Sequence, residues 1–192
     1  MKGHDMFTIP PMPPWDGMHP LVVHFPIALM FAVPVTLLMA LVWQKHTRAL
    51  LVCSALLMVL GTFGAWLATS TGSAAEELAE GIAGVDSALD RHEELGEAAR
   101  NFMTVLAAVL CVGVGACFVW PKKIGHRAVV AGGLGYLLAH AACTLAVANA
   151  AHAGGRLVHE FGVQARTGGA APLTTERSGS SSRERARDDD DD

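Results

Sequence analysis

Four long runs without a single Asp, Glu, Lys or Arg limit what this chain can fold into. They cover residues 21–43, 49–69, 101–120 and 128–151. Each run is about as long as the roughly 20 residues that a helix needs to cross the hydrocarbon core of a bilayer. Charged residues make up only 17% of the chain, against about 25% in a typical soluble domain. The sequence therefore predicts an all-α integral membrane protein built as a four-helix bundle.

The predicted transmembrane domain covers residues 19–163 and follows an irregular, proline-rich lead-in at residues 1–18. Its four helices are predicted at about residues 20–43, 49–70, 87–120 and 127–153. Residues 164–192 are rich in Gly, Ser, Thr and Arg and end in five aspartates. Because such a composition buries too little apolar surface to offset the entropy of ordering, we expect this acidic-ended C-terminal tail to be disordered.

The one long polar segment, residues 70–100, holds eight Asp or Glu against two Arg. Within it, some residues recur at steps of three and four, the spacing of one helical face. They are Leu78, Ile82, Val85, Leu89, His92, Gly96 and Ala99. Because Gly81 and Gly84 favour a break, we expect a short extramembrane helix, and then a second helix that continues into the third span. His92 should turn toward the bundle.

The Lys and Arg residues between the spans are concentrated in two short turns, residues 44–48 and 121–127. Short cytoplasmic loops carry an excess of Lys and Arg, so these turns are predicted to be cytoplasmic. Both termini and the acidic segment are then extracytoplasmic. This topology brings five of the nine histidines to the extracytoplasmic face, namely His19, His24, His92, His152 and His159.

Two features of these histidines bear on a site. His24 lies one turn inside the first apolar run, and a strongly polar side chain there is a functional-site hypothesis by default. His152 and His159 are seven residues apart, so a continuing helix places them on one face. Gly154-Gly155 between them leaves an alternative open, because glycines could end the helix or admit a flat ligand or another backbone.

Three stretches of this chain resemble a known family. They are the opening HPLVVHFPIAL from His19, the segment His92-Glu93-Glu94-Leu95-Gly96, and the closing stretch from His152 to His159. Together they resemble the bacterial membrane proteins grouped as domain of unknown function 2231, over about residues 19–163. The resemblance implies a multi-pass, four-helix protein of the bacterial inner membrane, and it implies no established activity.

One hypothesis for the histidine cluster is a b-type haem. Four-helix bundles hold cofactors between side chains on facing helices, and imidazole is a standard axial ligand of haem iron. The candidate cofactor-binding residues are His19, His24, His92, His152 and His159, and Gly96, Gly154 and Gly155 leave room for the macrocycle. The chain would then be an electron-transfer subunit that exchanges electrons with a quinol or a periplasmic redox protein.

Two alternatives stay open. Converging imidazoles also suit a transition-metal ion without porphyrin, with His24, His92, His152 and His159 as candidate ligands. In the other alternative the histidines only cap helices and hydrogen-bond carbonyls, as we expect for His140 near mid-membrane. The protein would then bind no cofactor and would be a structural or accessory membrane subunit.

Enzyme signatures are absent from the sequence. It has no G-x-S-x-G elbow, no phosphate-binding glycine-rich loop and no basic patch for nucleic acid. Its four cysteines, all within apolar runs, form neither C-x-x-C nor C-x-x-C-H, which argues against zinc-finger, thioredoxin-like and c-type haem motifs. We therefore expect the chain not to be an enzyme, and the lipid bilayer to be its principal partner.

Overall fold

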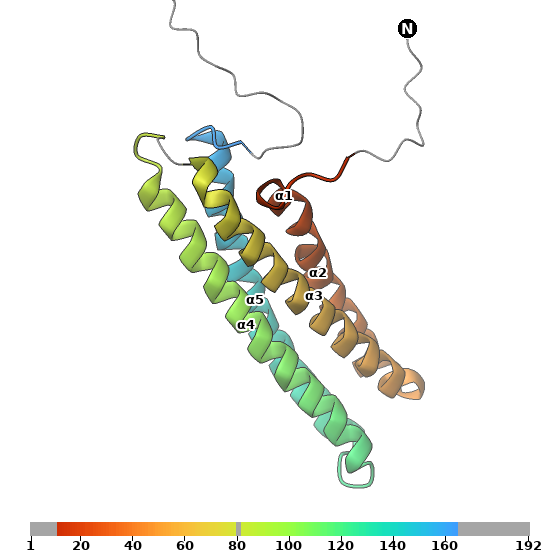
Figure 1. Cartoon of the computed structure of the whole chain (residues 1–192). Coiled ribbons are helices and arrows are strands. Elements are labelled where there is room, and N and C mark those ends of the chain that lie inside the picture. The colour runs from red at the N-terminus through yellow and green to blue at the C-terminus, as the bar shows by residue number, and fades with distance from the viewer. Residues whose placement is uncertain (1–10, 80–81, 165–192) are drawn as a thin grey trace, which may run out of the picture.

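The computed structural model describes residues 11–79 and 82–164, and the regular secondary structure of these residues is entirely helical. Four long helical segments run side by side (Figure 1), and each is long and apolar enough to cross a membrane. The predicted four-helix membrane fold is confirmed. The expected disorder of the C-terminal tail concerns residues 165–192, which lie outside the described residues.

The first span consists of two helices, α1 (His19–Val22) and α2 (His24–Val42), preceded by one 3-10 turn, η1 (Trp15–Gly17). The interruption at Val23 lies three residues before Pro26. Proline has no N–H and therefore cannot donate the i to i−4 hydrogen bond that would continue the ladder. The chain nevertheless stays in the right-handed helical region, because Val23 has φ −60° and ψ −28°.

The second span, α3 (Thr47–Ala75), follows the 3-10 turn η2 (Gln44–His46). It ends at Ala75 rather than at the predicted residue 70, and it passes directly into η3 (Glu76–Ala79). The short extramembrane helix that we predicted between the second and third spans is this 3-10 turn. Gly84 has a positive φ of 77°, a backbone conformation that glycine adopts without a steric penalty.

The last two spans are α4 (Asp86–Val119) and α5 (His126–His159). The helix α4 includes both the C-terminal part of the acidic segment and the third apolar run, as predicted. The helix α5 continues without a break through Gly154 and Gly155, so the alternative in which these glycines end the helix is wrong.

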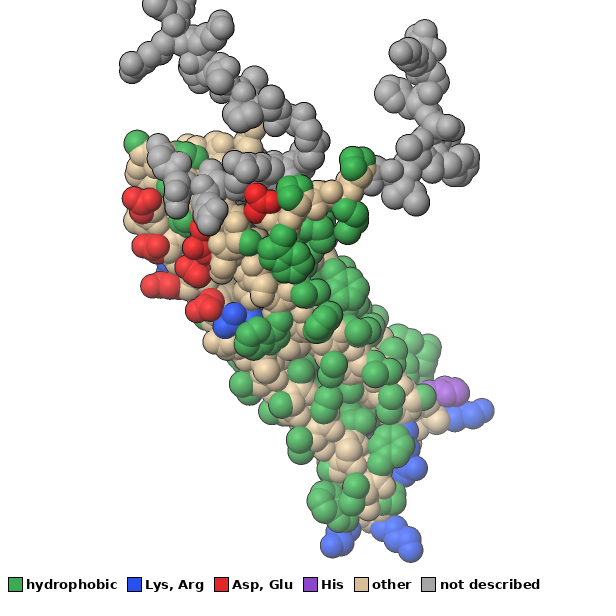
Figure 2. Space-filling model, in the orientation of Figure 1, with side chains coloured by type: hydrophobic (Ala, Val, Ile, Leu, Met, Phe, Trp, Pro, Cys, Tyr) green, Lys and Arg blue, Asp and Glu red, His purple; other side chains and the backbone are tan. Residues whose placement is uncertain are grey.

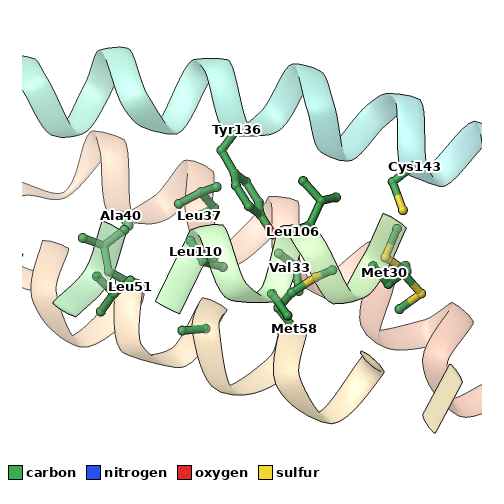
Figure 3. Close-up of a cluster of buried hydrophobic side chains, with 14 of the residues drawn as sticks. Met30, Val33, Leu37, Ala40, Leu51, Met58, Leu106, Leu110, Tyr136 and Cys143 are labelled. Atoms are coloured by element: carbon green, nitrogen blue, oxygen red, sulfur yellow. The ribbon is translucent and has the colours of Figure 1, made fainter. Parts of the chain in front are cut away.

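Successive segments pack as neighbours: α2 lies along α3, α3 along α4 and α4 along α5, while α5 meets α2 over a shorter length. The core between them contains mainly aliphatic side chains and methionines (Figure 3). Met30, Val33 and Leu37 of α2 and Met58 of α3 are almost completely buried in it. The helix α5 contributes Tyr136 and Cys143 to the same cluster.

His140 hydrogen-bonds α2 at the place where Pro34 interrupts the backbone pairing of that helix. Pro34 cannot donate to the Met30 carbonyl, which a helix without proline would use four residues later. The His140 imidazole, 2% exposed, donates a hydrogen bond from Nε2 to this Met30 oxygen at 2.9 Å. An unpaired carbonyl in lipid costs several kcal/mol, so the structural role that we expected for His140 agrees with its position.

A second, smaller core lies at the end of the bundle that carries the acidic segment. It contains Val85, the residue before α4, together with Ala88 of α4 and Leu157 of α5, and Leu89 packs against it. These contacts confirm that the apolar stripe of the acidic segment faces the bundle. The side chain of Leu78, which we placed on this stripe, lies outside the described residues.

The two ends of the bundle differ in charge (Figure 2). Acidic side chains gather over the first turns of α4, and Lys and Arg side chains lie at the opposite end, next to the turns that join α2 to α3 and α4 to α5. We call the first the histidine end, because it also carries His19, His24, His92, His152 and His159, and the second the basic end.

Glycines allow close helix packing at some positions only. A Cβ added to Gly64 would lie 2.8 Å from Phe25 Cδ1 and 3.1 Å from Pro26 Cδ, so Gly64 lets α3 pack closely against the first span. On α5, Gly132 and Gly135 have no atom within 4 Å of such a Cβ. Close packing within the chain uses Gly133 instead, whose added Cβ would meet Leu41 Cδ2 at 2.6 Å.

Replacement of Gly64 by alanine should destabilise the bundle. The new methyl group would overlap the rigid rings of Phe25 and Pro26, and overpacking of this kind costs about 1–3 kcal/mol. We expect Gly64→Ala to lower the midpoint of thermal unfolding in detergent by several degrees. Gly135→Ala, which adds the same methyl group into open space, is the matched control. Equal midpoints for the two variants would contradict the close α2–α3 packing.

Candidate functional site

A cavity of about 680 Å³ opens at the histidine end of the bundle. All of the long helices contribute to its wall, and most of the wall is apolar. Met30 and Met103 lie on its membrane side, and Leu157 and Val163 lie nearer the end of α5. Four of the five predicted histidines line it, namely His19, His24, His92 and His159. Four of the histidines that the sequence analysis placed at one face thus line one cavity.

His19, the first residue of α1, is held by the C-terminal turns of α3. Its Nδ1 donates a hydrogen bond to the Ala68 carbonyl of α3 at 2.8 Å, and Thr71 Oγ1 lies 3.4 Å from the same nitrogen. The ring lies against Gly72, where an added Cβ would be 3.2 Å from both Cε1 and Nδ1. Glycine at this position of α3 thus leaves the space that the imidazole occupies.

His92 is held in the same way by α5. Its Nδ1 donates to the Ala150 carbonyl at 3.0 Å, and the side chain is half-buried, as the apolar stripe predicted. A Cβ added to Gly154 would lie 2.8 Å from His92 Cε1. Gly154 therefore admits the imidazole of another helix. Gly96 and Gly155 also line the cavity and have open space beside them.

His19 and His92 form a pair across the cavity wall. Their ring centroids are 6.0 Å apart and their planes meet at 84°. Because each Nδ1–H is donated to a carbonyl, Nε2 of each neutral ring carries the lone pair. Among the described residues, neither Nε2 has a hydrogen-bond partner. Two imidazoles are thus oriented by backbone groups in the manner of metal-binding histidines.

The other three predicted histidines lie farther from this pair. His24 is exposed at the rim, and its Nδ1 donates to the Pro20 carbonyl at 2.6 Å. His159, the last residue of α5, also lies at the rim. His152 lines a separate groove between α4 and α5. The continuous helix α5 therefore does not bring His152 and His159 into one site.

Charged residues surround the cavity. Asp16, Glu76, Glu93 and Glu97 line it, with Arg100 as the cationic member. The Arg100 guanidinium contacts Glu97 Oε1 at 3.2 Å, donates to Thr69 Oγ1 at 3.3 Å, and stacks 4.2 Å above the Trp66 ring. The sequence analysis did not select Arg100. The available signal was its place as the last charged residue before the run at 101–120.

Glu76 and Glu93 approach each other at the rim. Burial raises the pKa of the Glu76 carboxyl, and the charge of Glu93 raises this pKa further, while a hydrogen bond from Ser73 opposes the shift. Ser73 belongs to the last turn of α3, and Glu76 is the first residue of η3. Glu93 comes from α4, one residue after His92, so the two carboxyls meet beside the histidine pair.

The donor groups of the cavity offer a pair of ligands rather than a full metal-binding set. Within the described residues, no three His, Cys, Asp or Glu side chains are grouped so that they could hold one metal ion. The four cysteines are free thiols, and none of them lines the cavity. The cavity thus presents two imidazoles, those of His19 and His92, beside a largely apolar space.

Comparison with known families now identifies the chain. The profile of a family described as "Predicted membrane protein (DUF2231)" matches residues 16–167. The chain belongs to this family. The match confirms the resemblance drawn from the His19, His92 and His152 stretches, and it covers every histidine of the cavity. No curated protein and no solved structure matches the chain.

The Glu76–Glu93 contact predicts a pH dependence of stability. Because the folded state raises the pKa of Glu76, its favourable contribution is full below the ordinary carboxyl pKa and is lost as the pH rises through the raised value. Glu76→Gln should therefore raise the thermal midpoint at about pH 8 and leave it unchanged at about pH 4, where an ordinary carboxyl is half protonated or more.

The matched control for this measurement is Glu94→Gln. Glu94 is 73% exposed and its only ion pair, with Arg91, spans 3.7 Å, so its loss should change the midpoint little at either pH. A midpoint of the Glu76 variant that is lower than that of the wild type at about pH 8 would refute the inference that the carboxylate is unfavourable there.

Proposed function

We propose that the cavity binds a b-type haem, with His19 and His92 as the axial ligands, and that the chain is an electron-transfer subunit of the bacterial inner membrane. The support comes from the geometry of the histidine pair, from the size and lining of the cavity, and from the charge of the turns. Relative to the sequence hypothesis, the proposal narrows five candidate ligands to two.

The separation of the two rings carries the proposal. Two imidazoles could hold one metal ion only where their rings lie close together, because each nitrogen binds a metal at about 2.0–2.1 Å. The observed distance between the His19 and His92 centroids is 6.0 Å. Both rings are already oriented through Nδ1, which reduces the entropy lost when a ligand binds.

The cavity suits a flat apolar ligand. Its volume of about 680 Å³ falls in the range of about 300–1,000 Å³ typical of small-molecule and cofactor sites. Gly96 and Gly155 face open space in its wall. Arg100 lies at the same wall and carries donors for a carboxylate such as a haem propionate. His24 and His159 at the rim offer further donors. Haem supplies one-electron chemistry, and the protein supplies ligation, orientation and exclusion of water.

The charge of the turns supports the orientation. Lys45 and Arg48 lie at one turn of the basic end, and Lys122, Lys123 and Arg127 lie at the other. Since short cytoplasmic turns carry an excess of Lys and Arg, the histidine end and both termini are extracytoplasmic in this proposal. The electron partner is then a quinol in the membrane or a periplasmic redox protein.

A transition-metal ion is the second candidate, and the acidic rim favours it. Glu93 and Glu97 line the cavity next to His92, and carboxylate oxygens can complete a set that begins with two imidazoles. The hydrogen bonds of His19 to α3 and of His92 to α5 also join helices. They are the observation that favours the structural alternative, in which no cofactor binds.

A reduced-minus-oxidised absorption spectrum tests the haem proposal. Protein expressed with haem available and purified in detergent should show a Soret band and stoichiometric iron. His19→Ala and His92→Ala should each lose most of the bound haem, because one axial bond then disappears. His46→Ala, an exposed histidine at the basic end, is the control and should keep it. All variants should keep the helical circular dichroism of the wild type.

Other outcomes separate the candidates. Stoichiometric zinc, copper or nickel without a Soret band would replace haem by a metal ion. Protein without iron or another metal, but destabilised by His19→Ala and His92→Ala, would support the structural role. Haem that is retained in both variants and lost in His24→Ala or His152→Ala would overturn the assignment of the axial pair.

Cysteine labelling tests the orientation. In a variant without native cysteines, Lys45→Cys should resist a membrane-impermeant maleimide in intact cells, and Ser87→Cys should react, because the first lies in a basic turn and the second at the exposed start of α4. Labelling of position 45 without position 87 would reverse the orientation and move the cavity to the cytoplasmic side.

A further inference from the structure

A second concave site lies between α4 and α5 at the histidine end, separate from the cavity. Its volume is about 280 Å³, and it is lined by Arg91 and Leu95 of α4 and by Asn149, His152, Ala153 and Arg156 of α5. The residues of each helix recur at steps of three and four, so each helix presents one face to the groove. We propose that this groove binds the phosphate group of a membrane glycerophospholipid.

The chemistry of the lining favours an anionic group. Two guanidinium groups, an imidazole and a side-chain amide all present N–H donors, and no carboxylate belongs to the lining. The acidic residues of α4, by contrast, lie mainly toward the cavity or on the exposed surface. Paired guanidinium groups match phosphate oxygens in both charge and geometry. Leu95 and Ala153 add an apolar floor.

The ion pairs of the two arginines leave donors available. Arg91 and Glu94 are 3.7 Å apart with side chains 63% and 73% exposed, a pair of the kind that contributes little in water. Glu160 binds Arg156 through Nε and Nη2. The donors on Arg156 Nη1 take no part in that contact, so the guanidinium can bind a second anion.

The depth of the groove matches the lipid headgroup layer. Arg100 is the charged residue of α4 that lies nearest the uncharged run 101–120. Leu95 is five residues farther out, about 7.5 Å along the helix axis at 1.5 Å per residue. A headgroup layer is about 5–7 Å thick on each side of the hydrocarbon core. The inner edge of the groove, at Leu95, therefore lies at the outer part of the headgroup layer, and the long side chain of Arg91 starts one turn farther out.

The surface below the groove suits acyl chains. Toward the basic end from the groove, α4 exposes Val105 and Val109, which are 58% and 54% exposed. At steps of seven inward from His152, α5 exposes Leu145 and Leu138, which are 64% and 76% exposed. A phospholipid whose phosphate occupies the groove can thus lay its chains along apolar side chains of both helices. Free phosphate would gain nothing from this surface.

Lipid retention measured by native mass spectrometry tests the proposal. Wild-type protein and the double variant Arg91→Gln/Arg156→Gln are delipidated in detergent and titrated with phosphatidylglycerol. We expect the double variant to bind the lipid about tenfold more weakly or worse, because two charge-assisted contacts are lost. Lys122→Gln/Lys123→Gln, which removes the same charge from the basic end, should bind as the wild type does.

Two outcomes would overturn the proposal. Equal lipid binding by the groove variant and the Lys122/Lys123 control would show that the groove holds no lipid. Displacement of the lipid by millimolar inorganic phosphate would show a site for free anions instead. A thermal midpoint of the double variant close to that of the wild type, measured without lipid, keeps a folding defect from imitating the expected loss.

Discussion

The need to pair every backbone polar group within lipid underlies this structure. Helices meet this need along most of the chain, because they pair each backbone N–H with a C=O of the same helix. The prolines of the first span interrupt this pairing locally. Pro34 leaves the Met30 carbonyl without its usual partner, and His140 of α5 supplies one from across the bundle. The polar side chain of His140 thus joins the last span to the first by a hydrogen bond.

The pairing at this point is incomplete within the described residues. His140 Nδ1 and Tyr136 Oη are buried and have no hydrogen-bond partner there. The two side chains lie one turn apart on α5, with ring centroids 5.9 Å apart. Of the four spans, α5 is also the least covered by the rest of the chain. The two unpaired polar atoms therefore lie on the helix that the rest of the chain covers least.

The same interaction, an imidazole bound to a helix carbonyl, builds the cavity. His19 joins α1 to Ala68 of α3, and His92 joins α4 to Ala150 of α5. Since an imidazole has two ring nitrogens, satisfying a carbonyl with Nδ1 leaves Nε2 for other chemistry. A contact that holds helices together and an oriented ligand are thus compatible in one residue. Both rings need a glycine on the facing helix, Gly72 or Gly154.

Much of the fold could be predicted from the sequence, because in a bilayer the positions of the helices follow from hydropathy along the chain. Apolar length gives the spans, and a three- and four-residue spacing gives the inward face of α4, including His92. The ends of α3 and α5 were harder, since both helices continue past the hydrocarbon layer, where hydropathy carries no signal. Gly154 looked like a helix end for a local reason, whereas its role, space for His92, depends on a neighbouring helix.

The arrangement of the candidate histidines shows the same limit. Topology brought five histidines to one end, but the helix rotations that bring His19 and His92 together depend on contacts between helices. His24 hydrogen-bonds the Pro20 carbonyl of the same span, which a spacing of four residues permits but does not require. His152 and His159 share a helix face because they are seven residues apart. His152 nevertheless lines the groove between α4 and α5, whereas His159 lines the cavity.

The cavity lies where the bundle changes from uncharged runs to charged residues. An ionisable ligand set near mid-membrane would require dehydration of every neighbouring charge, whereas one helical turn farther out the same groups keep contact with water. Arg100 marks this boundary, because its guanidinium is satisfied by Glu97, Thr69 and the Trp66 ring while its side chain is only 14% exposed. On the inner side of Arg100 the cavity wall is apolar, and on the outer side charged residues join the apolar ones. The cavity therefore spans the boundary itself, so that a ligand with an apolar body and a polar edge gains on both sides.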